Sequence, residues 1–138
     1  IENPAFIPEY SAFKNLKVLA SINSKVTDDE IKEVLEQVGL DPNEKKIYKK
    51  FSLGMKQKLG IANAVMGSPK VVLLDEPINA IDENGVENVR KIIAKLKEKG
   101  SIIIVACHDK EELEFLSDEI YTIFEGKIVD HRSLNENE

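Results

Sequence analysis

The chain has 138 residues, of which 42% are hydrophobic and 32% are charged, proportions that are typical of a folded globular protein and exclude a disordered one. The formal net charge of -6 argues against a surface that binds nucleic-acid phosphates. The single cysteine, Cys107, excludes an internal disulfide and a cysteine metal cluster, and it indicates a reducing compartment. The longest apolar run, residues 102–107, is far shorter than the roughly 20 residues that span a bilayer, so we expect a soluble chain.

Helices are predicted in the first half of the chain. Apolar residues recur at helical spacing in residues 11–22 and again in residues 27–40, so each segment should bury one face. Thr27 and Glu30, three residues apart, predict a capping box at the start of the second helix. A third helix should follow Ser52, and its alanines and large apolar residues lie on more than one face, which implies burial on several sides.

The hydrophobic pattern changes after Pro69. Residues 70–75 and 101–107 are continuous, largely β-branched apolar runs, which predict parallel strands covered on both faces. An amphipathic helix is predicted between them, at residues 84–100, so the three elements form a βαβ unit.

The last part of the chain predicts a short helix followed by a β-hairpin. Asp109, with Glu112 three residues later, is placed to cap the helix. The hairpin should occupy residues 119–131 and turn at Glu125 and Gly126. The fold class is therefore α/β.

Three titratable side chains follow the two predicted parallel strands. Asp75 and Glu76 lie at the end of the first strand, and His108 comes directly after the second. Ligands of open parallel sheets bind beyond the carboxyl ends of the strands, so we expect these side chains to converge on one site. An acid after a strand is often only part of a solvated turn or a helix cap, and the residues alone leave that alternative open.

The motif order in "FSLGMKQKLGIANAVMGSPKVVLLDEPINAID", residues 51–82, resembles that of the ATP-binding cassette (ABC) ATPases. A signature segment begins a helix, a strand ends in the Walker B acids, a D-loop follows, and a switch histidine comes later in "ACHD". Residues 1–20 are similar to the segment after the Q-loop in the drug- and bacteriocin-resistance branch of ABC exporters. The resemblance implies a partial P-loop NTPase (RecA-like) parallel sheet with an α-helical ABC subdomain.

The resemblance implies roles for the three residues that follow the strands. Asp75 matches the Walker B aspartate, which holds Mg²⁺, an ion that prefers oxygen ligands. Glu76 matches the catalytic glutamate that orients and polarises the attacking water. His108 matches the switch histidine that contacts the γ-phosphate of ATP, although a lone histidine is more often structural or solvated.

Four further residues match nucleotide-contacting positions of the family. Ser52 and Gly54 match the signature motif, which touches the γ-phosphate of ATP bound to the opposite subunit of a head-to-tail dimer. A serine at a helix N-terminus is suited to binding an anion, but it can equally be only a helix cap. Asp82 matches the D-loop aspartate, which would report across the dimer. Glu2 lies where most members have the Q-loop glutamine, and its carboxylate could hold a metal-bound water.

The resemblance also divides the chain into three parts. Residues 1–10 follow the Q-loop, residues 11–67 form the α-helical subdomain, and residues 68–138 form the C-terminal half of the ATPase core. No glycine is followed by another five residues later, so the chain contains no Walker A motif, G-x-x-x-x-G-K-[ST]. We therefore expect a C-terminal fragment of a longer subunit that is inactive alone.

The implied function is an ATP-binding and ATP-hydrolysing subunit, using ATP and Mg²⁺, that powers a membrane transporter, and an exporter in particular. The implied partners are a transmembrane permease and a second ATP-binding subunit, with no nucleic acid, and the implied location is the cytoplasmic face of the cell membrane. Phe6 and Tyr10 are candidate exposed contacts for the permease, or they pack against the first helix. The alternatives are a non-enzymatic dimerisation or regulatory module and an ABC ATPase outside transport. The transported substrate cannot be read from such a domain.

The strand order of the family implies one further property of the isolated chain. The absent phosphate-loop strand would lie between residues 101–107 and residues 119–124, so the first of these strands would have an unpaired apolar edge. Such edges are normally covered or blunted in proteins. We expect residues 119–124 to pair with residues 101–107, or a second copy of the chain to pair with that edge.

Overall fold

The computed structural model describes residues 6–22 and 25–134, so Glu2 lies outside the described residues. The chain divides into two compact units, Ile1–Ala106 and Cys107–Glu138. Within the described ranges, no helix combines the length and the apolar character that crossing a membrane would need.

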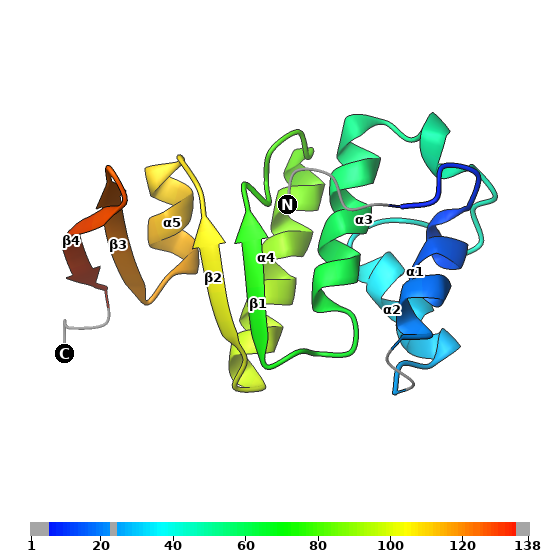
Figure 1. Cartoon of the computed structure of the whole chain (residues 1–138), viewed down its shortest axis with the longest axis horizontal. Coiled ribbons are helices and arrows are strands. Elements are labelled where there is room, and N and C mark those ends of the chain that lie inside the picture. The colour runs from blue at the N-terminus through cyan, green and yellow to red at the C-terminus, as the bar shows by residue number, and fades with distance from the viewer. Residues whose placement is uncertain (1–5, 23–24, 135–138) are drawn as a thin grey trace. The chain divides into compact units, whose positions relative to one another are not determined.

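Three helices that pack together open the first unit: α1 (Ala12–Ala20), α2 (Asp28–Gln37) and α3 (Leu53–Val65) (Figure 1). This confirms the helices predicted in the first half of the chain. Their shared core consists of large side chains that are at most 1% exposed, namely Leu16, Ile31, Leu35, Val38 and Leu59. The predicted capping box is present, because the Thr27 hydroxyl accepts from the Glu30 N–H and the Glu30 carboxylate accepts from the Thr27 N–H at 2.7 Å.

The segment before α1 is anchored by a buried asparagine. The Asn15 side chain is 2% exposed, accepts from the Ile7 N–H at 2.7 Å, and donates to the Ile7 carbonyl at 3.1 Å. Phe6 is only 7% exposed, and its ring lies 5.2 Å from that of Tyr48, in the short 3-10 helix Tyr48–Lys50. Of the two alternatives for Phe6, exposure was therefore wrong, and the side chain packs inside the protein, against Tyr48. Tyr10 is half-buried, with the Lys14 ammonium 3.9 Å from its ring centroid.

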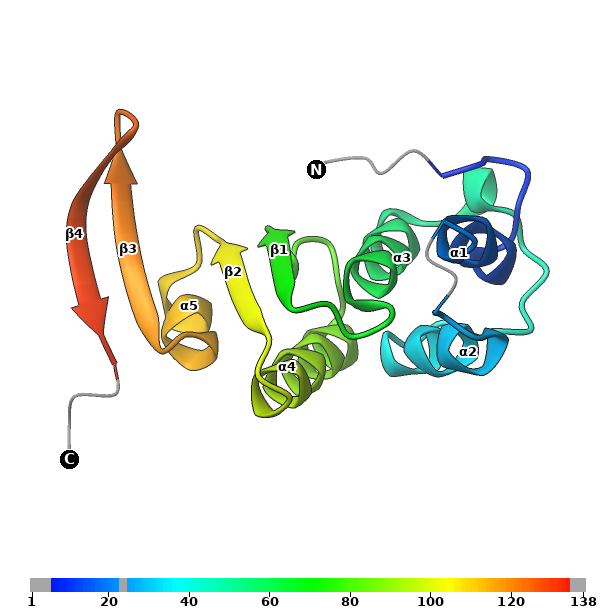
Figure 2. The same cartoon turned by 60° about the horizontal axis from the view of Figure 1, so that its bottom comes forward.

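The predicted βαβ unit is confirmed. It consists of β1 (Val71–Asp75), α4 (Glu83–Glu98) and β2 (Ile102–Ala106). The strands are parallel, and their register runs from Val71 beside Ile102 to Asp75 beside Ala106. Figure 2 shows α4 along one face of this sheet. Val72 and Leu74 of β1 are buried.

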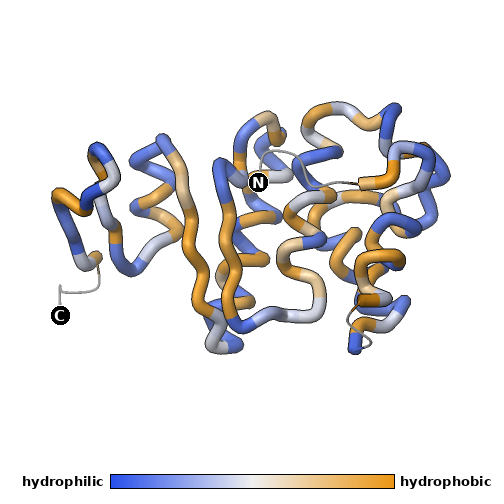
Figure 3. The backbone as a smooth tube through the Cα atoms, viewed as in Figure 1, coloured by the Kyte–Doolittle hydropathy of each residue, from blue (hydrophilic) through white to orange (hydrophobic). Residues whose placement is uncertain are grey.

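The opposite face of this sheet is exposed in the described part of the chain, so the prediction of strands covered on both faces was wrong. Figure 3 shows both strands as continuous hydrophobic segments. Side chains of a strand alternate between the two faces, and only one face is covered by helices here. The exposed fractions are 54% for Val71, 69% for Leu73, 62% for Ile102 and 56% for Ile104.

The second unit contains α5 (Lys110–Leu116), β3 (Glu119–Phe124) and β4 (Lys127–Ser133). Asp109 caps α5 by accepting from the Glu112 N–H at 3.1 Å, and β3 pairs antiparallel with β4. Glu125 and Gly126, with φ of 48° and 75°, form the turn, as is typical of a tight hairpin. The predicted capped helix and hairpin are confirmed. The described strands form two two-stranded sheets, β1 with β2 in the first unit and β3 with β4 in the second. The expected pairing of residues 119–124 with residues 101–107, or of a second copy with that edge, stays a prediction.

Candidate functional site

The loop that follows β1, residues 76–82, begins with an unusual backbone conformation. Glu76 has a φ of 45°, in the left-handed region that non-glycine residues rarely adopt. Its N–H donates to the Ala106 carbonyl at 2.8 Å, which continues the pairing of β1 with β2 by one residue. Its carbonyl accepts from the Asn79 N–H at 3.1 Å and from the Gln57 side-chain amide at 3.0 Å. Asp75, one residue earlier, is exposed at the end of β1.

Ser52 immediately precedes α3; it is exposed and has an extended backbone with φ of -65° and ψ of 163°. Its hydroxyl accepts from the Met55 N–H at 3.2 Å, so Ser52 is a helix cap. The remaining free N–H groups of the first turn and the positive end of the helix dipole favour an anion at this position. The structure thus supports the capping role directly, and a phosphate contact is compatible with it.

Gly54, in the first turn of α3, lies directly against the loop after β1. A Cβ atom at this position would lie 2.8 Å from the Ala80 carbonyl oxygen, closer than real Cβ contacts. Ala80 itself has a φ of 60°. A side chain at residue 54 would therefore push the helix and the loop apart, which is the physical reason for glycine here.

The end of the loop is bound to α3 by an ion pair. The Lys58 ammonium lies 2.9 Å from the Asp82 carboxylate, and their side chains are 17% and 63% exposed. The hydrogen bond from this ammonium, and then its charge, hold the pKa of the Asp82 carboxyl below its usual value of 3.8. Asp82 immediately precedes α4, so this pair joins the start of α4 to α3.

The structure brings Gly54, the Glu76 backbone and Asp82 together through α3 and the loop of residues 76–82. His108 belongs to the second unit, where it is exposed, and its convergence with Asp75 and Glu76 stays a prediction. Sequence reasoning missed Gln57 and Lys58, which bind both ends of the loop. Their spacing from Gly54, three and four residues along a helix, places all three on one face and was an available signal.

A magnesium ion at this site would need oxygen ligands from the described side chains. Among residues 6–22 and 25–134, no group of three or more His, Cys, Asp and Glu side chains is placed to hold a metal ion. Asp75 supplies one exposed carboxylate. Mg²⁺ commonly uses one or two carboxylates together with water and substrate phosphates, so this donor set fits Mg²⁺ in the company of a phosphate.

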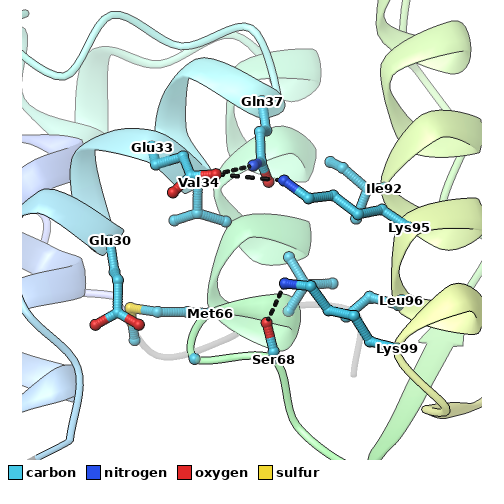
Figure 4. Close-up of a pocket in the computed structure, with 12 residues that line it drawn as sticks. Glu30, Glu33, Val34, Gln37, Met66, Ser68, Ile92, Lys95, Leu96 and Lys99 are labelled. Atoms are coloured by element: carbon cyan, nitrogen blue, oxygen red, sulfur yellow. Dashed lines mark hydrogen bonds and ion pairs between the residues drawn. The ribbon is translucent and has the colours of Figure 1, made fainter.

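A pocket in the first unit lies away from these residues, between α2, the end of α3 and α4 (Figure 4). Glu33 accepts from the Lys95 ammonium at 3.3 Å and from the Gln37 side-chain amide at 2.8 Å, while Lys99 lies 3.3 Å from the Ser68 hydroxyl. None of the predicted site residues lines it. The contact between Glu33 and Lys95 joins α2 to α4, and the contact between Lys99 and Ser68 joins α4 to the segment after α3.

Comparison with known proteins finds relatives that are named as transport ATP-binding proteins. The chain is 37% identical over 137 residues to the bacitracin transport ATP-binding protein BcrA of Enterococcus faecalis, covering 99% of this chain and 44% of that protein. It is 42% identical over 129 residues to the lantibiotic transport ATP-binding protein SrtF of Streptococcus pyogenes, covering 94% of this chain and 56% of the relative. The chain therefore spans about half the length of these curated relatives.

Solved structures agree in fold. A dimeric post-hydrolysis state of the ATP-binding cassette MJ0796, bound to ADP and Pi, matches with a TM-score of 0.84 and 22% identity, over 94% of this chain and 59% of that one. The ATP-binding subunit of an ABC transporter matches with a TM-score of 0.84 and 23% identity, over 97% of this chain and 57% of that one. The sequence pattern of the ABC transporter family matches residues 1–79. The chain belongs to the ABC transporter family.

Proposed function

We propose that this chain is part of an ATP-binding subunit that hydrolyses ATP to power a membrane exporter. The observation that carries the proposal is the contact between two family motifs: α3, which is capped by Ser52, binds the backbone of Glu76 directly after β1. The names of these relatives specify bacitracin and lantibiotic transport, which supports the transport assignment. Compounds of the bacitracin and lantibiotic classes are accordingly the substrates that we propose for the whole transporter.

The roles of the acids follow from their chemistry. Asp75 would bind Mg²⁺ through its exposed carboxylate, and Mg²⁺ when bound neutralises charge on the phosphates. Glu76 would accept a hydrogen bond from the attacking water and so orient and polarise it. His108 would contact the γ-phosphate, and Glu2 would hold a metal-bound water.

The remaining site residues would act across a head-to-tail dimer. Ser52 and Gly54 would bind the γ-phosphate of ATP held by a second ATP-binding subunit, with the first turn of α3 supplying N–H groups. Asp82 would communicate the presence of that contact across the dimer. We place residues 1–10 after the Q-loop, residues 11–67 in the helical subdomain and residues 68–138 in the ATPase core. A transmembrane permease would hold the subunit at the inner face of the membrane.

Measuring ATP turnover by the longer subunit that contains this chain tests the proposal. Glu76→Gln should lower turnover at least about 100-fold, because the amide cannot accept the proton of water as the carboxylate does. ATP affinity should stay within a few fold of the parental value, since the phosphate-binding groups are unchanged. Glu83→Gln, an exposed acid in the first turn of α4, is the matched control and should hydrolyse ATP at the parental rate.

The possible outcomes of this turnover experiment distinguish the candidate functions. Parental turnover in Glu76→Gln would show that Glu76 is not the catalytic residue. A longer subunit without Mg²⁺-dependent ATP turnover would favour the non-enzymatic dimerisation or regulatory module, an alternative that the missing Walker A motif in these 138 residues keeps open. The 138-residue chain alone should show only background turnover.

A further inference from the structure

We propose that Gln57 is a positioning residue for Glu76: its side-chain amide fixes the orientation of the Glu76 backbone and thereby aims the Glu76 carboxylate. This inference rests on the proposed function, in which Glu76 acts on the attacking water. Gln57 lies on α3, 19 residues before Glu76 in the sequence, so the contact joins two elements that only the fold brings together.

The Glu76 backbone needs such an interaction. Its φ of 45° is unfavourable for a residue with a side chain, and it persists only if surrounding contacts stabilise it. Pro77 follows, and a proline has no N–H group, so the peptide between residues 76 and 77 has its carbonyl as its one hydrogen-bonding group. Gln57 donates to that carbonyl at 3.0 Å, and the Asn79 N–H donates to it at 3.1 Å.

The contact is part of a continuous interface between α3 and the loop of residues 76–82. Gly54 lies against the Ala80 carbonyl in the middle of the loop, and Lys58 pairs with Asp82 at its end. Gln57 supplies the contact at the beginning of the loop. Gly54, Gln57 and Lys58 share one helix face, so this one face of α3 contacts the loop at its beginning, middle and end.

The chemistry of this contact is specific and can be tested. The Glu76 carbonyl requires a donor, which a glutamine amide supplies and an ionised glutamate cannot. Gln57→Glu keeps the size and shape of the side chain but removes the donor above the pKa of its carboxyl. Protonation at lower pH restores an O–H donor in that variant.

The experiment uses the longer subunit and measures ATP turnover as a function of ATP concentration and pH. Gln57→Ala and Gln57→Glu should lower kcat about 10-fold or more at pH 7.5, because a small misplacement of a catalytic group is costly, while KM for ATP stays within about twofold. The kcat of Gln57→Glu, relative to that of the parent, should rise as the pH falls towards 5. Gln37→Glu and Gln37→Ala are matched controls, since Gln37 is the other glutamine of the chain and lies on α2.

A second measurement does not depend on activity. In the 138-residue chain, Gln57→Ala should accelerate hydrogen exchange of the Glu76 and Asn79 amides at least about fivefold and leave the α2 amides unchanged. The positioning role would be overturned by a kcat equal to the parental value, whether or not KM changes. It would also be overturned by unchanged exchange of these two amides. A parental subunit without turnover would instead overturn the proposed function, and the exchange data would still report whether the Gln57 contact orders the loop.

Discussion

At the scale of single residues, the Lys58–Asp82 pair is the clearest electrostatic feature of the candidate site. Its distance is 2.9 Å, and the lysine side chain is mostly buried while the carboxylate faces solvent. Water screens such a carboxylate, so the pair stabilises the fold less than a buried pair would. Its main effect is local, because it fixes the position of Asp82, the residue immediately before α4, relative to α3.

Lys58→Met should raise the pKa of the Asp82 carboxyl towards its usual value of 3.8, because the variant removes the hydrogen bond and the charge that lower it. A depressed pKa means that the pair stabilises the fold above about pH 3.8 and loses this contribution as the pH falls through the lower, folded-state pKa. Carbon chemical shifts of the Asp82 carboxyl, followed against pH, measure this. Lys17→Met, on α1, is the control and should leave the Asp82 titration unchanged, whereas equal titrations in Lys58→Met and the parent would contradict the assigned cause.

At the scale of elements, the boundaries of the helices follow local side-chain chemistry. Helix α2 has only 10 residues, and isolated helices of this length are marginal in water. It is stabilised by burial of Ile31, Val34 and Leu35 and by the capping box of Thr27 and Glu30 at its start. The cap therefore contributes to the stability of the three packed helices. One of these helices, α3, contacts the candidate site.

Thr27→Ala should lower the free energy of unfolding by about 1 kcal/mol, because it removes the hydroxyl that accepts from the Glu30 N–H. Urea denaturation followed by circular dichroism measures the change. Thr27→Ser retains the hydroxyl and is the matched control, with an expected loss of less than about 0.5 kcal/mol. A loss of the same size in both variants would show that the threonine methyl group, and not the cap, is responsible.

At the scale of the whole molecule, the sheet of the first unit has one exposed apolar face. It presents Val71, Leu73, Ile102 and Ile104, each more than half exposed. Strand β2 pairs with β1 along one edge only among the described strands, so backbone groups of its other edge are free of strand pairing. Both features favour association with another polypeptide.

The 138-residue chain should therefore self-associate as its concentration rises, which sedimentation velocity over a concentration series measures. Replacing Leu73 and Ile104 by lysine should shift the chain to monomer, since charges on this face oppose its burial. Ile22→Lys is the control, because Ile22 is 84% exposed, comes two residues after the end of α1 and lies outside the sheet. A strictly monomeric parental chain whose amides from Ile102 to Ala106 exchange as fast as a free peptide would contradict both the association and the strand assignment.

The sequence alone determined the features that depend on neighbours in the chain. Helical periodicity predicted α1, α2 and α3, the spacing of Thr27 and Glu30 predicted the capping box, and Glu125 with Gly126 predicted the hairpin turn. The order of Ser52, Asp75 and Glu76 also sufficed to identify the family, because each motif is short and contiguous. These signals act over a few residues, so no knowledge of packing was needed.

Only the tertiary structure decided which surfaces meet. It buried Phe6 against Tyr48, left one face of the β1–β2 sheet exposed, and brought Gln57 to the Glu76 carbonyl. Periodicity places Gln57 on a face of α3, but the partner of that face depends on how α3 packs against residues 19 or more positions away. The left-handed backbone of Glu76 likewise follows from contacts with Ala106 and Gln57, which are distant in sequence, and not from a local preference of glutamate.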